Sequence, residues 1–226
     1  MTHSIDIIYE DNHLLVFDKP AGILCQGDES GDDSLVELGK RYLKETYNKP
    51  GNVFLGLVHR LDRPVSGVVV MAKTSKALTR LNKQFSDREV TKIYWALTEE
   101  RPPKDEDKLV HYLGKDSSKN KAHTSVKPKA GFKEAELSYK MIGYRSRLFL
   151  LEVSPKTGRP HQIRIQLAKI GCPIAGDVKY GWLGKNKEGK IALHAKSVKI
   201  IHPTKNEELT LTSKEPKEHF WQKYFS

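Results

Sequence analysis

Apolar runs and apolar residues at helical spacing predict the elements of the first part of this chain. The ranges 5–9 and 13–18 are β-rich runs separated by Glu10-Asp11-Asn12, which predicts a hairpin. Ser34 is a suitable N-cap for a helix that ends at about Tyr47. The apolar residues of this helix share one face and are Leu35, Leu38, Tyr42 and Leu43.

A buried strand and a second helix are predicted next. Val68-Val69-Val70-Met71 is continuous rather than alternating, as expected of a strand that is buried on both faces. A helix is expected from Thr74 or Ser75 to about Asp87, because apolar residues recur there at helical spacing. The range 91–98 then predicts another strand.

The second half of the chain is predicted to consist mainly of strands. After a charged, exposed loop at 99–108, the expected strands are 109–114, 121–127, 134–143 and 147–153, joined by polar turns such as 116–120. A helix is expected from His161 to Ile170, and the late elements are strands at 191–201 and 208–212 and a helical tail at 215–225. No repeat or linker indicates a second domain, so residues 1–226 are predicted to form one domain. The strands alone permit either a central sheet or two sandwiched sheets.

Composition indicates a soluble globular protein, because 38% of the residues are hydrophobic and 30% are charged. No window approaches the ~18 consecutive apolar residues of a membrane span, and the N-terminus has no secretory pattern. Cys25 and Cys172 are far apart and form no C-x-x-C motif, so we expect two reduced thiols. These features predict a cytoplasmic protein, with a monomer as the default state.

The net charge of +11 is unevenly distributed. Residues 1–58 carry five lysines and arginines against ten acidic residues, whereas residues 115–170 carry thirteen against four. This asymmetry favours a basic surface for a polyanion, with nucleic acid as the leading candidate. From charge alone, a well-solvated lysine-rich face is an equally good interpretation.

The chemistry of the chain centres on Asp62, which lies between Arg60 and Arg63 on a Pro/Gly-punctuated loop before the buried strand. Functional side chains are often mounted on a loop that a rigid scaffold holds. Two guanidiniums nearby would keep the Asp62 carboxylate ionised. The simpler alternative is a salt-bridged loop residue, so Asp62 needs support from the rest of the chain.

Three further positions carry candidate chemistry. Tyr94, on the strand at 91–98, has a phenol that could stack on a base and exchange a proton, although a core aromatic residue is the commoner outcome. His161 and Arg164 share a helical face, and the arginine could hold a carboxylate bidentately or be an ordinary surface charge. His194 lies on a late apolar strand, where a satisfied core histidine is the usual case.

Several kinds of site have no motif in this sequence. There is no paired-carboxylate motif of glycoside hydrolysis, and the histidines and cysteines lack the spacing of a zinc site. No glycine-rich loop would hold phosphates or a dinucleotide. The chemistry of Asp62 is therefore expected to need neither a metal nor an organic cofactor.

Several short motifs occur along the chain in a definite order. They are DKPAG at 18–22, HRLD at 59–62 with Ser66-Gly67, K-x-Y-x-A around Tyr94, R-x-HQIR at 159–164, G-x-PI-x-GD at 171–177, Tyr180-Gly181, LHA at 193–195 and His202-Pro203. In their order and spacing they resemble the motifs of the RluA-type family of RNA pseudouridine synthases. The resemblance covers nearly the whole chain.

This resemblance implies an α+β fold, with a mixed, mainly antiparallel central β-sheet flanked by helices and a central active-site cleft. It implies isomerisation of uridine in ribosomal or transfer RNA, without a cofactor. Asp62 would be the catalytic carboxylate, Arg164 would pair with Asp62, and Tyr94 would stack on the uracil. Arg60 would fill the gap left by the flipped base. The resemblance also implies substrate-binding positions at His59, Arg159, His161 and Ile163.

The sequence departs from the family pattern at two positions. Val65 replaces the usual threonine before Ser-Gly, and Gln166 replaces a common histidine. Each change could alter RNA contacts or loop rigidity. The small N-terminal RNA-binding domain of many relatives is expected to be absent, so RNA would bind the basic surface of the catalytic domain. The alternatives are a non-catalytic RNA-binding or RNA-folding protein, and a nucleic-acid N-glycosidase that would release free uracil.

Overall fold

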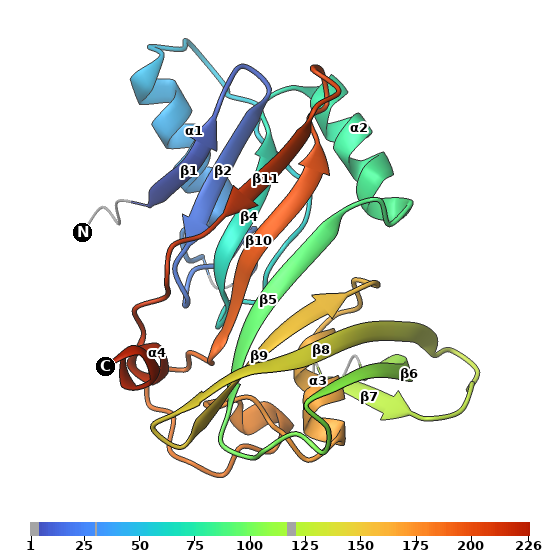
Figure 1. Cartoon of the computed structure of the whole chain (residues 1–226). Helices are drawn as coiled ribbons and strands as arrows, with labels where there is room; N and C mark the ends of the chain where they lie inside the picture. The colour runs from blue at the N-terminus through green and yellow to red at the C-terminus, as the bar shows by residue number, and fades with distance from the viewer. Residues whose placement is uncertain (1–4, 30, 117–120) are drawn as a thin grey trace. The chain divides into compact units, whose positions relative to one another are not determined.

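The computed structural model describes residues 5–29, 31–116 and 121–226 of the chain (Figure 1). The chain forms two compact units. The first consists of Met1–Thr91 and Ala195–Glu215, and the second of Lys92–His194 and Pro216–Ser226. The chain thus leaves the first unit after Thr91, returns to it at Ala195 and leaves it again after Glu215. The expectation that residues 1–226 act as one domain stays a prediction.

The first unit contains a sheet with the strand order β1-β2-β4-β10. Its strands are β1 (Asp6–Glu10), β2 (Leu14–Lys19), β3 (Gly56–Leu57), β4 (Ser66–Ala72), β10 (Leu193–Ile201) and β11 (Glu208–Thr212). Strand β3 pairs with β4, and β11 pairs with β10. The predicted hairpin at the N-terminus and the late strand pair are confirmed, because β1–β2 and β10–β11 are both antiparallel.

Strand β4 is buried on both faces, as its apolar run predicted. All seven of its residues are buried. Val68 and Val70 belong to one core cluster with Ala77 and Leu81 of α2 (Ser75–Ser86). From the other helix, α1 (Leu35–Thr46), Gly39 approaches Phe17 of β2 so closely that an added Cβ would lie 3.1 Å from the ring. Because Phe17 pairs with Val69, whose side chain faces away from Val68 and Val70, the two helices lie on opposite faces of the β2–β4 pair.

Both helices begin at the residues that the sequence predicted. The Ser34 hydroxyl accepts a hydrogen bond from the Glu37 N–H at 3.4 Å, and the Thr74 hydroxyl accepts one from the Ala77 N–H at 3.2 Å. Each cap satisfies one N–H that a helix terminus otherwise leaves without a partner. Local sequence signals therefore set these two boundaries.

The second unit contains a sheet with the strand order β5-β9-β8-β6-β7. Its strands are β5 (Thr91–Thr98), β6 (Glu106–Asp116), β7 (Lys121–Ser125), β8 (Lys133–Arg145) and β9 (Leu148–Pro155), and neighbouring strands are antiparallel. Helix α3 (Gln162–Lys169) packs through Ile165 against Leu113, Ala122 and Ala135 of this sheet. A 3-10 turn, η1 (Val178–Tyr180), and α4 (His219–Phe225) complete the unit. The predicted α+β class with a mainly antiparallel sheet is confirmed.

Two predicted boundaries differ most from the structure. The loop expected at 99–108 ends early, because Glu106 already pairs with Lys140 of β8 and so belongs to β6. The helical tail expected at 215–225 begins only at His219. Pro216 favours an extended conformation at Glu215, which excludes a helix start at 215, and Glu218 is itself extended as the N-cap. Residues 117–120 of the predicted turn lie outside the described residues.

Candidate active site

Asp62 lies on a loop whose neighbouring residues are anchored through their backbone. The Leu61 N–H donates to Cys25 Sγ at 3.3 Å, and the Cys25 thiol donates to the Leu61 carbonyl at 3.4 Å. The Arg63 carbonyl accepts the Gly22 N–H at 2.7 Å. The Asp62 carbonyl accepts the Val65 N–H at 3.1 Å, which closes a turn. The half-buried carboxylate therefore projects from a loop that is held on both sides.

Lys19 is the second anchor of this loop, and sequence reasoning did not identify it. Its ammonium is fully buried and donates to the carbonyls of Pro20 at 3.1 Å, Ile23 at 2.8 Å and Arg63 at 3.3 Å. The lysine thus ties the turn at 20–23 to the residue after Asp62. A lysine that directly follows an apolar strand and precedes Pro-Ala-Gly was the available signal. The DKPAG motif therefore supports the Asp62 loop.

The basic residues around Asp62 have different environments. Arg60 is exposed. Arg63 pairs with Asp32 at 2.7 Å and donates through Nε to the Gly22 carbonyl at 3.0 Å. Arg63 therefore bonds to the acidic loop and to the turn at Gly22, and a position of both guanidiniums near the Asp62 carboxylate stays a prediction.

His59 fastens the start of the loop to β4. Its Nε2 accepts the Val70 N–H at 3.1 Å, and its ring stacks on Phe85 with centroids 5.0 Å apart. An accepting Nε2 places the proton of a neutral imidazole on Nδ1. These contacts indicate a structural role for His59, and substrate binding by this residue stays a prediction.

In the second unit, Arg164 is buried and holds Asp177 in a two-point ion pair. Nε donates to Oδ2 at 2.7 Å and Nη2 donates to Oδ1 at 2.8 Å, and the guanidinium carbon lies 5.1 Å from the Tyr180 ring centroid. The alternative of a surface charge is therefore wrong. The fork uses two of the five N–H donors of a guanidinium, so it is compatible with a second carboxylate. Because Asp62 belongs to the first unit, its pairing with Arg164 stays a prediction.

His161 is held in a defined orientation just before α3. Its backbone is left-handed, with a φ of 53°. The Ala122 N–H donates to the Tyr180 hydroxyl at 2.9 Å, and this hydroxyl lies 2.7 Å from His161 Nδ1. A hydroxyl that accepts from Ala122 can donate its own proton to Nδ1, which favours the neutral tautomer with a proton on Nε2.

The two other residues predicted near α3 differ in exposure. Ile163 is buried, with 6% of its surface exposed. The Arg159 Nε donates to the Glu134 carbonyl at 3.0 Å in an exposed position. Their predicted roles in substrate binding remain predictions.

Tyr94 is half-buried on β5, where it pairs with Val153 of β9. The next residue, Trp95, pairs with Glu152 and packs near Phe225. Because successive strand residues point to opposite faces, Tyr94 and Trp95 lie on different faces of the sheet. His194, in contrast, is 1% exposed and lies edge-on to Trp221, as expected of a core histidine.

Comparison with known proteins assigns the family. The family model described as RNA pseudouridylate synthase matches residues 13–169. The chain belongs to the RNA pseudouridylate synthase family. The predicted class, an RNA pseudouridine synthase and hence an isomerase, is confirmed at the level of the family.

Curated relatives named ribosomal large subunit pseudouridine synthase C match most of this synthase chain. The protein of Buchnera aphidicola subsp. Schizaphis graminum is 33% identical over 98% of this chain and 70% of the relative. That of Buchnera aphidicola subsp. Acyrthosiphon pisum is 35% identical over 87% and 63%, and that of Rickettsia typhi is 35% identical over 93% and 68%. The chain thus spans roughly two thirds of the length of these relatives.

Solved structures of human proteins share the fold of this synthase. Human RNA Pseudouridylate Synthase Domain Containing 4 aligns with a TM-score of 0.78 and 24% identity, over 96% of this chain and 90% of the human chain. Human RNA Pseudouridylate Synthase Domain Containing 1 aligns with a TM-score of 0.77 and 23% identity, over 99% and 89%. At this identity the likeness shows the fold.

The two departures from the family pattern are both buried in this synthase. Val65 is 2% exposed. Gln166 is fully buried, and its Nε2 lies 3.2 Å from the Leu109 carbonyl, 3.1 Å from the Ala135 carbonyl and 3.0 Å from His111 Nδ1. Burial lowers the pKa of His111. Gln166 therefore joins α3 to β6 and β8, so its expected effect is on packing rather than on RNA contact.

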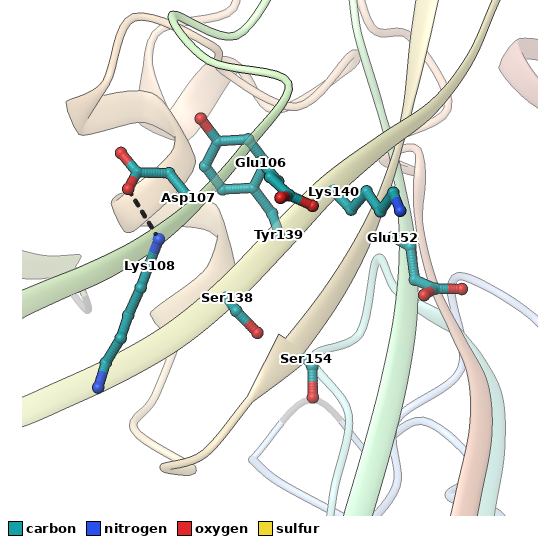
Figure 2. A pocket seen from close by; sticks show the side chains of 8 residues that line it. All are labelled: Glu106, Asp107, Lys108, Ser138, Tyr139, Lys140, Glu152 and Ser154. Atoms are coloured by element: carbon teal, nitrogen blue, oxygen red, sulfur yellow. Dashed lines mark hydrogen bonds between the residues drawn. The ribbon is translucent and has the colours of Figure 1, made fainter.

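A polar pocket of about 440 Å³ lies over β6, β8 and β9 of the synthase (Figure 2). None of the predicted site residues lines it. A cross-strand row of charged residues consists of Glu106, Lys140 and Glu152 and continues to Trp95. Because Trp95 and Tyr94 are consecutive strand residues, this charged row and Tyr94 lie on opposite faces of the sheet.

Within residues 5–29, 31–116 and 121–226, no group of three His, Cys, Asp or Glu side chains could hold a metal ion. None of the described helices is long and apolar enough to cross a membrane.

Proposed function

We propose that this chain converts uridine to pseudouridine in RNA of the large ribosomal subunit, as a single catalytic domain that needs no metal or organic cofactor. The observation that carries this proposal is the anchored loop, which presents one carboxylate from a fixed backbone. The ribosomal substrate is inferred from the names of the curated relatives. The chain would act as a monomer in the cytoplasm, where ribosomal RNA is found.

Asp62 is the catalytic carboxylate of this proposal. It either attacks the nucleotide or removes a ribose proton, and both routes require the ionised form. The N-glycosidic bond breaks, the uracil turns, C5 bonds to C1′, and the proton on C5 is replaced by one on N1. The reaction is redox-neutral. Cys25 and Lys19 position the loop, which lowers the conformational cost of bringing the carboxylate to the ribose.

Four further residues assist this chemistry. Tyr94 stacks on the uracil and assists loss of the C5 proton, and Arg164 orients Asp62 while Asp177 orients Arg164. A stacked base cannot react, so the uridine leaves the RNA helix, and the exposed Arg60 fills the gap. Basic residues of the segment 115–147 bind the phosphates, so a change of one of them is expected to weaken RNA binding without abolishing turnover.

The decisive experiment maps pseudouridines in total RNA from a strain that lacks this protein. The strain is complemented with wild type, with Asp62→Ala, or with Asp33→Ala as a matched control, because Asp33 is exposed and pairs with Arg41. We expect one or more ribosomal sites to be lost on deletion and restored by wild type and Asp33→Ala only. If the lost site lay in transfer RNA, the substrate would be transfer RNA rather than ribosomal RNA, and the proposed reaction would be unchanged.

Other outcomes contradict the proposal. Appreciable modification by Asp62→Ala would refute the assigned chemistry. Release of free uracil by the purified protein would indicate an N-glycosidase. RNA binding without any modified site would favour the non-catalytic alternative.

A further inference from the structure

The segment 182–190 of the second unit is a basic loop that the proposed reaction does not use. We call it the Lys-loop, and its sequence is WLGKNKEGK. It carries Lys185, Lys187 and Lys190, and it lies outside the basic segment 115–170. Lys190 pairs with Glu188 at 3.2 Å. Lys185 and Lys187 are exposed and have no ion pair in the described part of the chain.

The Lys-loop is built around a fully bonded amide. Asn186 Nδ2 donates to the Gly176 carbonyl at 2.7 Å and to the Lys190 carbonyl at 2.6 Å, and Oδ1 accepts the Gly189 N–H at 2.9 Å. Trp182 is buried and lies edge-on to Phe220, with centroids 5.5 Å apart. A loop that only carries solvated charge needs neither a buried tryptophan nor an internal amide bridge. These contacts therefore fix the backbone from which Lys185 and Lys187 project.

Aromatic rings accompany these lysines. A hollow of about 290 Å³ is lined by the Lys-loop and by Glu218, His219 and Phe220. His219 is exposed and Phe220 is half-buried, and their rings lie 5.6 Å apart. The hollow has three lysines against the two carboxylates Glu188 and Glu218, so its balance is basic. Lysines beside aromatic rings match the phosphates and base of unpaired RNA.

The Lys-loop is also connected to the predicted catalytic arginine. Asn186 bonds to the carbonyl of Gly176, and the next residue, Asp177, holds the guanidinium of Arg164. Gly176 has a φ of +87°, and an added Cβ would lie 2.7 Å from the Lys190 carbonyl. A shift of the Lys-loop would therefore act on the backbone of Asp177 through the Gly176 carbonyl.

We propose that the Lys-loop binds a single-stranded segment of the RNA substrate, with Lys185 and Lys187 on phosphates and His219 stacked on a base. This inference rests on the proposed function, because it assumes that RNA is the substrate. It adds a contact surface separate from both the Asp62 loop and the basic segment 115–170.

The test measures the affinity of the whole chain for a fluorescein-labelled, uridine-containing hairpin RNA over a range of salt. In Lys185→Gln/Lys187→Gln, the slope of log affinity against log salt should fall by about 1.4, because each phosphate contact with a single strand contributes about 0.7. This corresponds to roughly 25-fold weaker binding at 0.1 M salt. Lys185→Arg/Lys187→Arg should keep the affinity.

A matched control removes the same charge elsewhere. Lys44 and Lys76 are exposed and have no ion pair among the described residues, so Lys44→Gln/Lys76→Gln should leave the slope unchanged. His219→Ala should weaken binding roughly fivefold or more with an unchanged slope, since stacking involves no counterion. Thermal midpoints check that each variant folds.

The outcomes separate this inference from the proposed function. An unchanged slope in Lys185→Gln/Lys187→Gln would overturn the inference, even if pseudouridine forms normally. The same result together with lost binding to polyglutamate would assign the loop to an acidic protein. Absence of pseudouridine with wild type would refute the proposed function. A smaller salt dependence of RNA affinity in Lys185→Gln/Lys187→Gln would still support RNA binding by the Lys-loop in that case.

Discussion

Replacement of Gly67 by alanine tests how closely the Asp62 loop and its sheet are packed. Gly67 lies in β4 with a φ of +112°, a conformation that residues with a Cβ rarely adopt. A Cβ built there would lie 2.2 Å from the carbonyl oxygen of Ala195, 2.7 Å from its nitrogen and 2.8 Å from its carbonyl carbon. All three neighbours are backbone atoms of β10, so no side chain can move aside.

The expected loss of stability has two parts. The positive φ costs an L-residue about 1–2 kcal/mol. The overlap requires a backbone shift on the order of 1 Å, and overpacking of this kind costs about 1–3 kcal/mol. Gly67→Ala should therefore lower the free energy of unfolding by about 2–5 kcal/mol. For a chain of this size, each kcal/mol lowers the thermal midpoint by about 2–4 °C.

Two other glycines separate these contributions. Gly22 has a φ of +102° but nothing within 4 Å of an added Cβ, so Gly22→Ala should show the conformational cost alone. Gly27 has no such φ and no close neighbour, so Gly27→Ala should stay within about 0.5 kcal/mol of wild type. Differential scanning calorimetry measures the thermal midpoints of the three variants, which should fall from Gly27→Ala through Gly22→Ala to Gly67→Ala. If Gly67→Ala melted at the same temperature as Gly22→Ala, the close approach to Ala195 would be refuted.

Two further predictions concern pH and thiol chemistry. Burial raises the pKa of Asp11, but the N–H groups of His13 and Leu14 and the ring of His202 outweigh it and lower this pKa to about 2. The carboxylate should therefore stabilise the fold above its unfolded pKa of 3.8, by on the order of 2 kcal/mol, and lose this contribution as the pH falls from about 4 to 2. Asp11→Asn should remove this part of the pH dependence of the free energy of unfolding in urea. An unchanged loss of stability from about pH 4 to 2 in this variant would contradict the assignment to Asp11. Burial also raises the pKa of Cys25 and raises that of Cys172 to about 11, so iodoacetamide at pH 8 should label both thiols only in urea, as read by mass spectrometry. Rapid labelling of the folded chain would refute this.

The elements that depend on local signals could be predicted from the sequence. Helices α1 and α2 begin after Ser34 and Thr74 because a hydroxyl at the N-cap and the apolar spacing act within a few residues. Strand β4 was identified by four consecutive apolar residues. These features need no knowledge of which distant segment lies beside them.

Contacts between distant residues could not be predicted in the same way. Arg164 could be a surface charge or a carboxylate partner until the structure placed it on Asp177, thirteen residues later. Lys19 reads as an ordinary polar residue at a strand end, yet it is fully buried among three carbonyl groups. Burial of a charge depends on segments that supply its partners, and hydrophobic periodicity does not encode them.

The division of the first unit between two distant parts of the chain affects how it forms during synthesis. Strands β1, β2 and β4 leave the ribosome well before Ala195–Glu215, which supplies β10 and β11. Asp18, at the end of β2, obtains its hydrogen bonds from the Ser213 hydroxyl at 2.6 Å and the Lys214 N–H at 3.1 Å only then. A nascent chain therefore carries Asp62 long before its supporting sheet is complete. Products released before about residue 214 would contain the sequence around Asp62 without the complete sheet that supports its loop.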